Sequence, residues 1–204
     1  MDPTALILDY GNVLSRPQRV ESVEAMARDA GTSPEDFRRA YRLHRDAYDA
    51  GDLSAADYWK RVLETLGRRS TTSAAVERFI QRDVESWTSY RDDIWVLART
   101  FRTGDRRTAM LTNMPPEILA RIRADRRLES WFDVVVASCE IGLIKPDPRA
   151  YDVCLSRLGV TADRTIFVDD STVNITAAAR LGIGTLHFAG EESVRDLLVR
   201  LGMA

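Results

Sequence analysis

Five polar residues of this sequence lie at or just beyond the ends of short apolar runs: Asp9, Thr112, Lys145, Asp169 and Asp170. An ionised carboxylate at the end of a buried strand is unfavourable unless it is paired or has a function there. Together the five residues offer a carboxylate, a hydroxyl, an ammonium group and a pair of adjacent carboxylates. A magnesium-assisted phosphoryl transfer needs these groups at one point in space. The set therefore predicts phosphoryl-transfer chemistry, provided that the fold brings the residues together.

The apolar runs themselves predict the elements that must position these residues. Their apolar residues are consecutive rather than alternating, which is typical of parallel strands covered on both faces. The predicted strands are 5–8, 108–111, 134–137, 165–168 and 185–188. Helical patterns separate the later strands, beginning at Pro115 and covering 148–158 and 172–181. The alternation predicts an α/β fold: a Rossmann-like, doubly wound parallel sheet of about five strands, with ligands at the carboxyl ends of the strands.

Far more than one crossover helix separates the first two predicted strands. Helical patterns cover 20–30, 34–50, 54–66 and 73–86, and Ser54-Ala55-Ala56-Asp57 predicts a capping box at the third. Helices of this number and length form a bundle rather than a linker. We therefore expect residues 16–87 to form a helical cap over a core of residues 1–15 and 88–204. A further predicted helix, 92–102, returns the chain to this core.

Composition and charge exclude several classes of partner. The 204 residues are 45% hydrophobic and 29% charged, with a net charge of −2, so the basic excess of a nucleic-acid-binding protein is missing. No apolar run approaches the ~20 residues of a membrane span, and a first strand at residue 5 leaves no room for a secretory signal. Cys139 and Cys154 are not spaced as a CxxC pair. We expect a cytoplasmic protein with a small-molecule partner; the sequence leaves the oligomeric state open.

Four motifs in the chain resemble those of the haloacid dehalogenase (HAD) superfamily, in the branch with a helical cap inserted after the first motif. In order they are LILDYGNVL, MLTN, GLIKPDP and IFVDDSTVNITAAARLG, and the resemblance covers nearly the whole chain. It implies a Rossmann-like core and, for most members, a magnesium-dependent phosphatase that works through a phosphoaspartyl intermediate. The Gly-Asn pair after the first aspartate also resembles certain sugar-phosphate phosphatases of the superfamily.

The resemblance implies a role for each polar residue. Asp9 matches the nucleophile, and an aspartate is already ionised at neutral pH, so it needs no base to activate it. Thr112 matches the hydroxyl that binds a phosphoryl oxygen. Lys145 matches the cation that holds nucleophile and phosphate together by offsetting their repulsion. These roles imply acyl-phosphate chemistry on Asp9.

The resemblance also implies the residues around the metal ion and the phosphate. The ligands implied for Mg²⁺ are Asp9, the backbone carbonyl of Gly11, Asp169 and Asp170. The residues implied to contact phosphate are Gly11, Asn12 and Asn113. Asn174 stands where many relatives carry another aspartate, and we interpret it as support for the metal ligands.

Gly11 departs from the pattern of most phosphatase relatives, which carry a second aspartate there as the general acid and base. Glycine supplies the same backbone carbonyl but no proton donor, and general acid catalysis typically contributes ~10²–10⁴ in rate. We therefore expect leaving groups that depart without strong protonation, such as the anomeric oxygen of a sugar 1-phosphate or an acyl phosphate. Relatives with the same Gly-Asn pair are active phosphatases, so activity is still expected.

Aromatic residues in the predicted cap could face the substrate, namely Tyr41, His44, Tyr48 and Trp59. Aromatic residues at helical spacing more often pack inside a bundle, and we favour packing for these. His187, in the last predicted strand, is expected to be a core or edge residue.

Two alternative functions remain open beside the phosphatase. A metal-independent 2-haloacid dehalogenase would use Asp9 to attack carbon, although the pair Asp169-Asp170 argues against it. A catalytically weak protein that binds a phosphorylated metabolite would explain Gly11. Receiver domains use similar residue types, but their acidic pair comes first in the chain and they have no large helical insertion. The sequence favours a magnesium-dependent phosphatase of a small metabolite and leaves the physiological substrate open.

Overall fold

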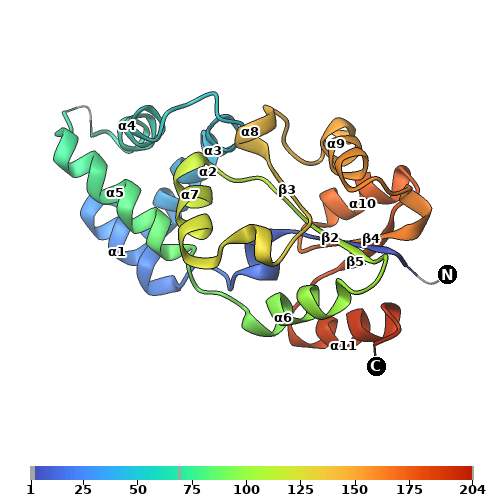
Figure 1. The fold of residues 1–204 in the computed structure, drawn as a ribbon. Helices are drawn as coiled ribbons and strands as arrows, with labels where there is room; N and C mark the ends of the chain where they lie inside the picture. Colours follow the sequence, from blue (N-terminus) through green and yellow to red (C-terminus); the bar gives the residue numbers. More distant parts are fainter. Residues whose placement is uncertain (1–2, 69, 204) are drawn as a thin grey trace.

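A five-stranded parallel sheet forms the centre of the computed structural model, which describes residues 3–68 and 70–203 (Figure 1). The strand order is β3-β2-β1-β4-β5. The strands are β1 (Ala5–Leu8), β2 (Arg107–Thr112), β3 (Val134–Ala137), β4 (Thr165–Asp169) and β5 (Gly184–His187). The predicted α/β fold with five parallel strands and a helical insertion between the first two is confirmed.

Helices cover both faces of the sheet. They are α6 (Asp92–Phe101), α7 (Pro116–Arg126), α8 (Ser138–Ile141), α9 (Pro148–Leu158), α10 (Thr172–Arg180) and α11 (Glu191–Arg200). Figure 1 shows α6 and α11 on one side of the sheet and α9 and α10 on the other. Leu6 and Leu8 pack into the core that includes residues of α6, α7 and α11, whereas Ala5 and Ile7 pack into the core that includes α9 and α10. Because both faces are covered, successive strand residues are apolar.

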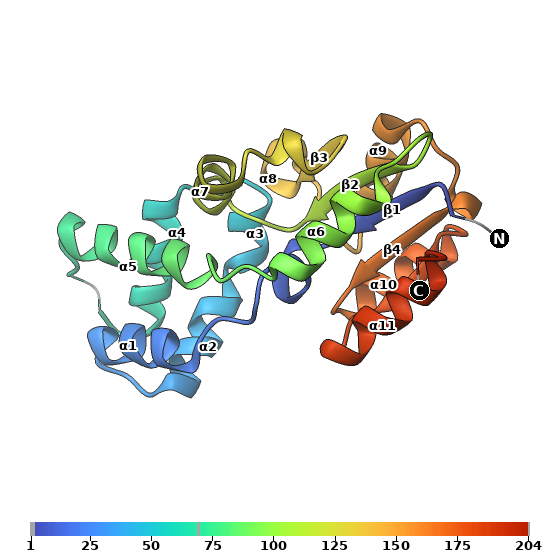
Figure 2. The ribbon, with the colours of Figure 1, turned by 60° about the horizontal axis from the view of Figure 1, so that its bottom comes forward.

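The insertion is a bundle of five helices, which Figure 2 shows gathered at one end of the molecule. They are α1 (Val20–Ala30), α2 (Pro34–Leu43), α3 (Arg45–Asp49), α4 (Ala55–Thr65) and α5 (Ser73–Ser86). Trp59 lies at the centre of the bundle. Its ring centroid is 6.2 Å from that of Phe37 and 5.1 Å from that of Phe79. This apolar core is separate from the two cores that cover the sheet.

The structure corrects the prediction of a single helix over residues 34–50. The helix α2 ends at Leu43, and His44 leaves the helical conformation with φ −115° and ψ 6° before α3 begins at Arg45. The break has no glycine or proline to mark it, so the local pattern could not reveal it. It is accompanied by long-range packing, since α3 contacts α4 within the cap and α8 in the core. The short helix α8 and the terminal helix α11 were also not predicted.

Two chain segments join the bundle to the sheet and lie side by side. Ser15 and Tyr90 form an antiparallel bridge, the Arg16 amide donates to the Ser89 carbonyl at 2.6 Å, and the Arg91 amide donates to the Leu14 carbonyl at 3.0 Å. We propose that this junction separates a cap of residues 16–87 from a core of residues 1–15 and 88–204. Among the described residues, every helix is too short or too polar to cross a membrane.

Candidate active site

Asp9 lies at the carboxyl end of the central strand β1, where its amide donates to the Val168 carbonyl of β4 at 2.9 Å. The chain then turns through Tyr10–Leu14 with Asn12 at φ 59°, a left-handed conformation that asparagine adopts more readily than most residues. The turn places the Asn12 amide against the end of β4, where Nδ2 donates to Asp170 Oδ2 at 2.6 Å. Adjacent parallel strands thus bring the first and last motifs together.

Lys145 connects three strand ends through its ammonium group. Its Nζ lies 2.8 Å from Asp9 Oδ1 and 2.7 Å from Asp169 Oδ2, and it donates to the Leu111 carbonyl of β2 at 2.9 Å. These partners match the three donors of an ammonium group. Burial alone would lower the pKa of Lys145, but Asp9 and Asp169 outweigh it and raise the pKa above its ordinary value. The lysine is therefore a buried, permanent cation.

The residues that follow β2 hold Lys145 in place. The Asn113 side chain accepts from the Lys145 amide at 2.8 Å and donates to the Lys145 carbonyl at 2.9 Å. Thr112, the last residue of β2, pairs with Ala137 of β3 and is buried. It follows Leu111, whose carbonyl receives the Lys145 ammonium. All these residues therefore lie at the same edge of the sheet as Asp9.

Three carboxylates meet at this edge, since oxygen atoms of Asp9, Asp169 and Asp170 all lie within 4.8 Å of one another. Asn174 Nδ2 lies 3.1 Å from both oxygens of Asp169, to which it donates. Gly11 borders the same cluster, because a Cβ there would lie 3.7 Å from Asp9 Oδ2. The donor set consists of carboxylate oxygens, with the Gly11 backbone nearby, and oxygen ligands of this kind fit Mg²⁺.

The charges in this cluster do not balance without a further cation. Burial raises the pKa of Asp9 to about 7; Lys145 opposes the shift, while Asp169 and Asp170 add to it. Without a bound cation Asp9 is therefore only partly ionised at neutral pH, in contrast to the expectation from the sequence. Burial also raises the pKa of Asp170, although the hydrogen bond from Asn12 lowers it. Three carboxylates facing one ammonium group repel one another. A divalent cation among them would offset that repulsion.

A cavity of about 180 Å³ separates this edge of the sheet from the cap. Gly11 and Asn113 line it from the core, opposite Tyr41, Arg45, Asp49 and Trp87. Of these cap residues, the sequence pointed to Tyr41 alone. The i,i+4 spacing of Arg45 and Asp49 predicts an ion pair from the sequence. The spacing does not show whether the pair faces the cavity.

The other cap aromatic residues lie away from the cavity. Tyr48 and Trp59 are buried within the cap, as the packing interpretation predicted. His44 lies near the Thr65 hydroxyl, 3.3 Å from Nε2 to Oγ1. His187 is exposed on the edge strand β5, as expected of an edge residue, and its Nε2 lies 2.9 Å from the Asp170 carbonyl. These residues therefore pack or support rather than line the cavity.

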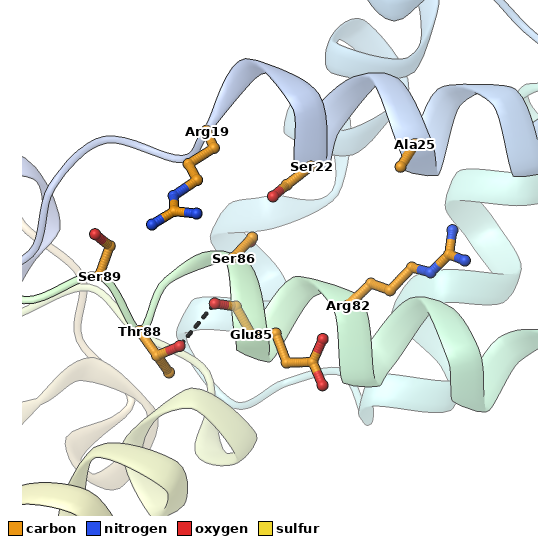
Figure 3. Close-up of a pocket in the computed structure, with 8 residues that line it drawn as sticks. All are labelled: Arg19, Ser22, Ala25, Arg82, Glu85, Ser86, Thr88 and Ser89. Carbon is orange, nitrogen blue, oxygen red and sulfur yellow. Dashed lines mark hydrogen bonds between the residues drawn. The ribbon is translucent and has the colours of Figure 1, made fainter.

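A larger cavity of about 470 Å³ lies between α1 and α5, on the cap (Figure 3). Its lining includes Arg19 and Ser22 on one wall and Arg82 and Glu85 on the other. Arg82 is paired with Asp29. None of the residues that line it belongs to the polar set predicted from the sequence. The smaller cavity beside Asp9 is therefore the candidate active site.

A family model described as haloacid dehalogenase-like hydrolase matches residues 5–182. This chain belongs to that family. Membership confirms the resemblance based on the four motifs and identifies the chain as a hydrolase with a helical cap.

Curated relatives match the chain over different lengths. It is 46% identical to acyl-CoA dehydrogenase family member 10 of Mus musculus over 72 residues, 35% of this chain and 7% of that protein. It is 33% identical to flavin mononucleotide hydrolase 1 of Arabidopsis thaliana over 116 residues, 56% of this chain and 46% of that protein. The chain thus spans less than half the length of these two relatives. D-ribitol-5-phosphate phosphatase of Bacteroides thetaiotaomicron matches 89% of this chain and 90% of its own length, with 22% identity.

Solved structures share the fold over nearly the whole chain. A HAD family enzyme of Bacteroides thetaiotaomicron, solved in complex with magnesium, has a TM-score of 0.79 at 20% identity and covers 97% of this chain and 99% of its own. L-2-haloacid dehalogenase of Xanthobacter autotrophicus has a TM-score of 0.66 at 20% identity, covering 97% and 82%. At this identity the likeness concerns the fold alone.

Proposed function

We propose that this hydrolase is a magnesium-dependent phosphatase that removes phosphate from a small metabolite through a phosphoaspartyl intermediate on Asp9. The observation that carries the proposal is the buried Lys145 ammonium, 2.8 Å from Asp9 and 2.7 Å from Asp169, beside a cluster of three carboxylates. Two of the relatives are named for the hydrolysis of phosphorylated compounds, flavin mononucleotide and D-ribitol 5-phosphate. A metal-independent dehalogenase would have no need of this acidic cluster.

In this proposal Asp9 attacks phosphorus, and Lys145 both orients the attacking carboxylate and offsets its repulsion by the phosphate. The phosphoryl oxygens are bound by the Thr112 hydroxyl and by backbone and side-chain groups of Gly11, Asn12 and Asn113. Asp9, Asp169, Asp170 and the Gly11 carbonyl would hold Mg²⁺, and Asn174 Nδ2 donates to Asp169. The bound ion would supply positive charge next to the transferring phosphoryl group.

The substrate is expected to be compact, because the cavity between core and cap measures about 180 Å³. Because Gly11 supplies no proton donor, we expect the enzyme to favour substrates with good leaving groups, such as sugar 1-phosphates. A proton donor elsewhere in the cavity would widen this range. We also propose that the enzyme acts in the cytoplasm, as its composition suggests.

An assay of metabolite phosphates and p-nitrophenyl phosphate, with Mg²⁺ or with excess chelator, tests the proposal. We expect Mg²⁺-dependent release of phosphate that is abolished in Asp9→Asn and unchanged in Asp152→Asn, which alters an exposed aspartate of α9. Chloride release from 2-chloropropionate in the presence of chelator would instead establish the dehalogenase. Phosphate-ester binding without turnover would establish a binding protein.

A further inference from the structure

Gly11 leaves the site without a proton donor at the position where most phosphatase relatives carry one, and a cap carboxyl group lines the same cavity. We propose that Asp49 is the general acid of this enzyme: it donates a proton to the leaving oxygen and later accepts one from the attacking water. The inference rests on the proposed function, because it requires phosphoryl transfer to Asp9.

Contacts with both the cap and the core hold Asp49 in position. It is the last residue of α3 and lines the cavity together with Gly11 and Asn113. Its backbone carbonyl accepts from the Ser138 hydroxyl of α8, and Ser138 Oγ in turn accepts from the Met114 amide at 2.9 Å. The loop after β2, which holds Lys145, is thus connected to the cap residue across the cavity. The side chain of Asp49 is only 11% exposed, so bulk water does not compete with it.

Asp49 belongs to a buried cluster with more negative than positive groups. Arg45 Nε donates to Asp49 Oδ1 at 2.7 Å, and Arg45 Nη1 lies 3.3 Å from Asp83 Oδ2. One guanidinium group therefore faces two carboxylates. A single proton on one of the carboxyl groups makes the cluster neutral, which a buried site favours.

Hydrogen bonds decide which carboxyl group carries that proton. Asp83 also accepts from the Tyr41 hydroxyl at 2.7 Å and from Gln18 Nε2 at 3.4 Å. Burial raises the pKa of Asp83, and Arg45 and the hydrogen bond from Tyr41 lower it, so these donors favour its anion. Asp83 is not among the residues that line the cavity, whereas Asp49 is. The exchangeable proton is therefore placed on Asp49, at the cavity wall.

The groups that face Asp49 from the surrounding elements favour protonation near neutral pH. Burial raises the pKa of Asp49 to about 6; Arg45 lowers it, and Asp83 and Asp46 raise it. Tyr58 of α4 and Cys139 of α8 also face Asp49. A carboxyl group that titrates near the working pH can both donate and accept a proton, which is what acid–base catalysis requires.

The proposed reaction has two steps, transfer of the phosphoryl group to Asp9 and hydrolysis of the phosphoaspartate. An Asp9 carboxylate oxygen forms a bond to phosphorus while the bond from phosphorus to the leaving oxygen breaks. The leaving oxygen takes the Asp49 proton, so an alcohol departs and Asp49 becomes a carboxylate. Water then attacks phosphorus while the bond from phosphorus to the Asp9 oxygen breaks, and a proton of the water passes to the Asp49 carboxylate. Phosphate is released, Asp9 is again a carboxylate and Asp49 is again protonated.

The variant Asp49→Asn tests this role with little structural change. The amide oxygen can still accept from Arg45, and the cluster loses its surplus negative charge, so we expect a folded protein. We expect kcat/KM for an alkyl phosphate, such as a polyol phosphate, to fall by ~10²–10⁴. With p-nitrophenyl phosphate, whose leaving group needs no protonation, kcat/KM should stay close to wild type. Asp152→Asn, which alters an exposed aspartate of α9, serves as the matched control and should leave both values unchanged.

The kinetic results distinguish a failure of the Asp49 role from a failure of the proposed function. Equal losses with both substrates, or no loss with either, overturn the role of Asp49, as does a wild-type enzyme that hydrolyses only the aryl ester. A wild-type enzyme inactive on every phosphate ester contradicts the proposed function itself. If Asp49→Asn does not fold, the wild-type ratio of alkyl to aryl kcat/KM serves instead. This ratio should fall as pH rises through the titration of Asp49, and a constant ratio overturns the proposal.

Discussion

At the scale of single residues, the site depends on one buried cation. Lys145 contacts Asp9 and Asp169 and is itself almost fully buried, with 4% of its surface exposed. A buried ion pair contributes little net stability when intact, but removal of one partner leaves the other charged and uncompensated. The lysine is thus needed for the fold around the site as well as for the proposed chemistry.

Substitution Lys145→Met should impair both the stability of the fold around the site and the proposed chemistry. We expect loss of phosphatase activity and, in the absence of Mg²⁺, a free energy of unfolding lower by about 3–5 kcal/mol. Urea unfolding followed by circular dichroism measures the change. Added Mg²⁺ should recover part of the lost free energy of unfolding, because the cation would offset the repulsion between the carboxylates that Lys145 no longer neutralises. Lys60→Met, at an exposed position of α4, is the matched control; a similar loss there would contradict the argument.

At the scale of elements, local capping and long-range packing contribute separately. Ser33, Ser54 and Thr72 accept from backbone amides at the first turns of α2, α4 and α5. Ser54 caps α4 as predicted, since its Oγ accepts from the Asp57 amide at 3.1 Å, although the Asp57 carboxylate accepts from the Ser54 hydroxyl at 2.7 Å and the reciprocal backbone bond of a full capping box is not seen among the described residues. The start of α4 is therefore encoded locally, unlike the break between α2 and α3.

Substitution Ser54→Ala removes the cap without touching the site. Because the Asp57 amide loses its acceptor, we expect the free energy of unfolding to fall by about 0.5–2 kcal/mol, with kcat/KM unchanged. Urea unfolding and a phosphatase assay measure the two quantities. Ser73→Ala lies after the capping residue of α5, at an exposed position, and should change stability by less than about 0.5 kcal/mol. Equal effects at both serines would argue against the capping role.

At the scale of the whole molecule, the cap and the core meet through a few close contacts next to the cavity. The Tyr48 hydroxyl donates to Glu117 of α7 at 2.8 Å. Gly51, with φ 84°, packs so closely on α8 that a Cβ would lie 3.0 Å from the Cys139 carbonyl oxygen. Since Asp49 is two residues earlier, this contact helps to set the distance between Asp49 and the core.

Substitution Gly51→Ala should therefore separate the cap from the core. We expect lower stability and a lower kcat/KM for alkyl phosphates, because Asp49 would move away from the leaving oxygen. Gly67→Ala is the matched control: Gly67 has a similar φ of 81°, but a Cβ there would meet nothing within 4 Å. Both variants carry the backbone strain of a left-handed alanine, so only the excess effect at Gly51 reports on the contact. Urea unfolding and steady-state kinetics measure it, and equal effects would contradict this account.

The sequence alone determined the strands, their parallel arrangement, the helical insertion and the polar residues at the strand ends. These features are encoded locally: apolar runs predict buried strands, and parallel strands place their carboxyl ends at one edge of a sheet. Asp9, Lys145 and Asp169 could be expected to meet because each follows or lies near such a run. The tertiary structure then showed the contacts that join them.

Which cap residues face the site depends on tertiary contacts that the sequence does not reveal. The chain breaks its helical path at His44 without a local signal, and Arg45 and Asp49, which follow the break, line the cavity. The physical reason is that an amphipathic pattern identifies a buried face but not the element against which that face packs. Contacts between residues far apart in the chain, such as Asp49 with Ser138, make that choice.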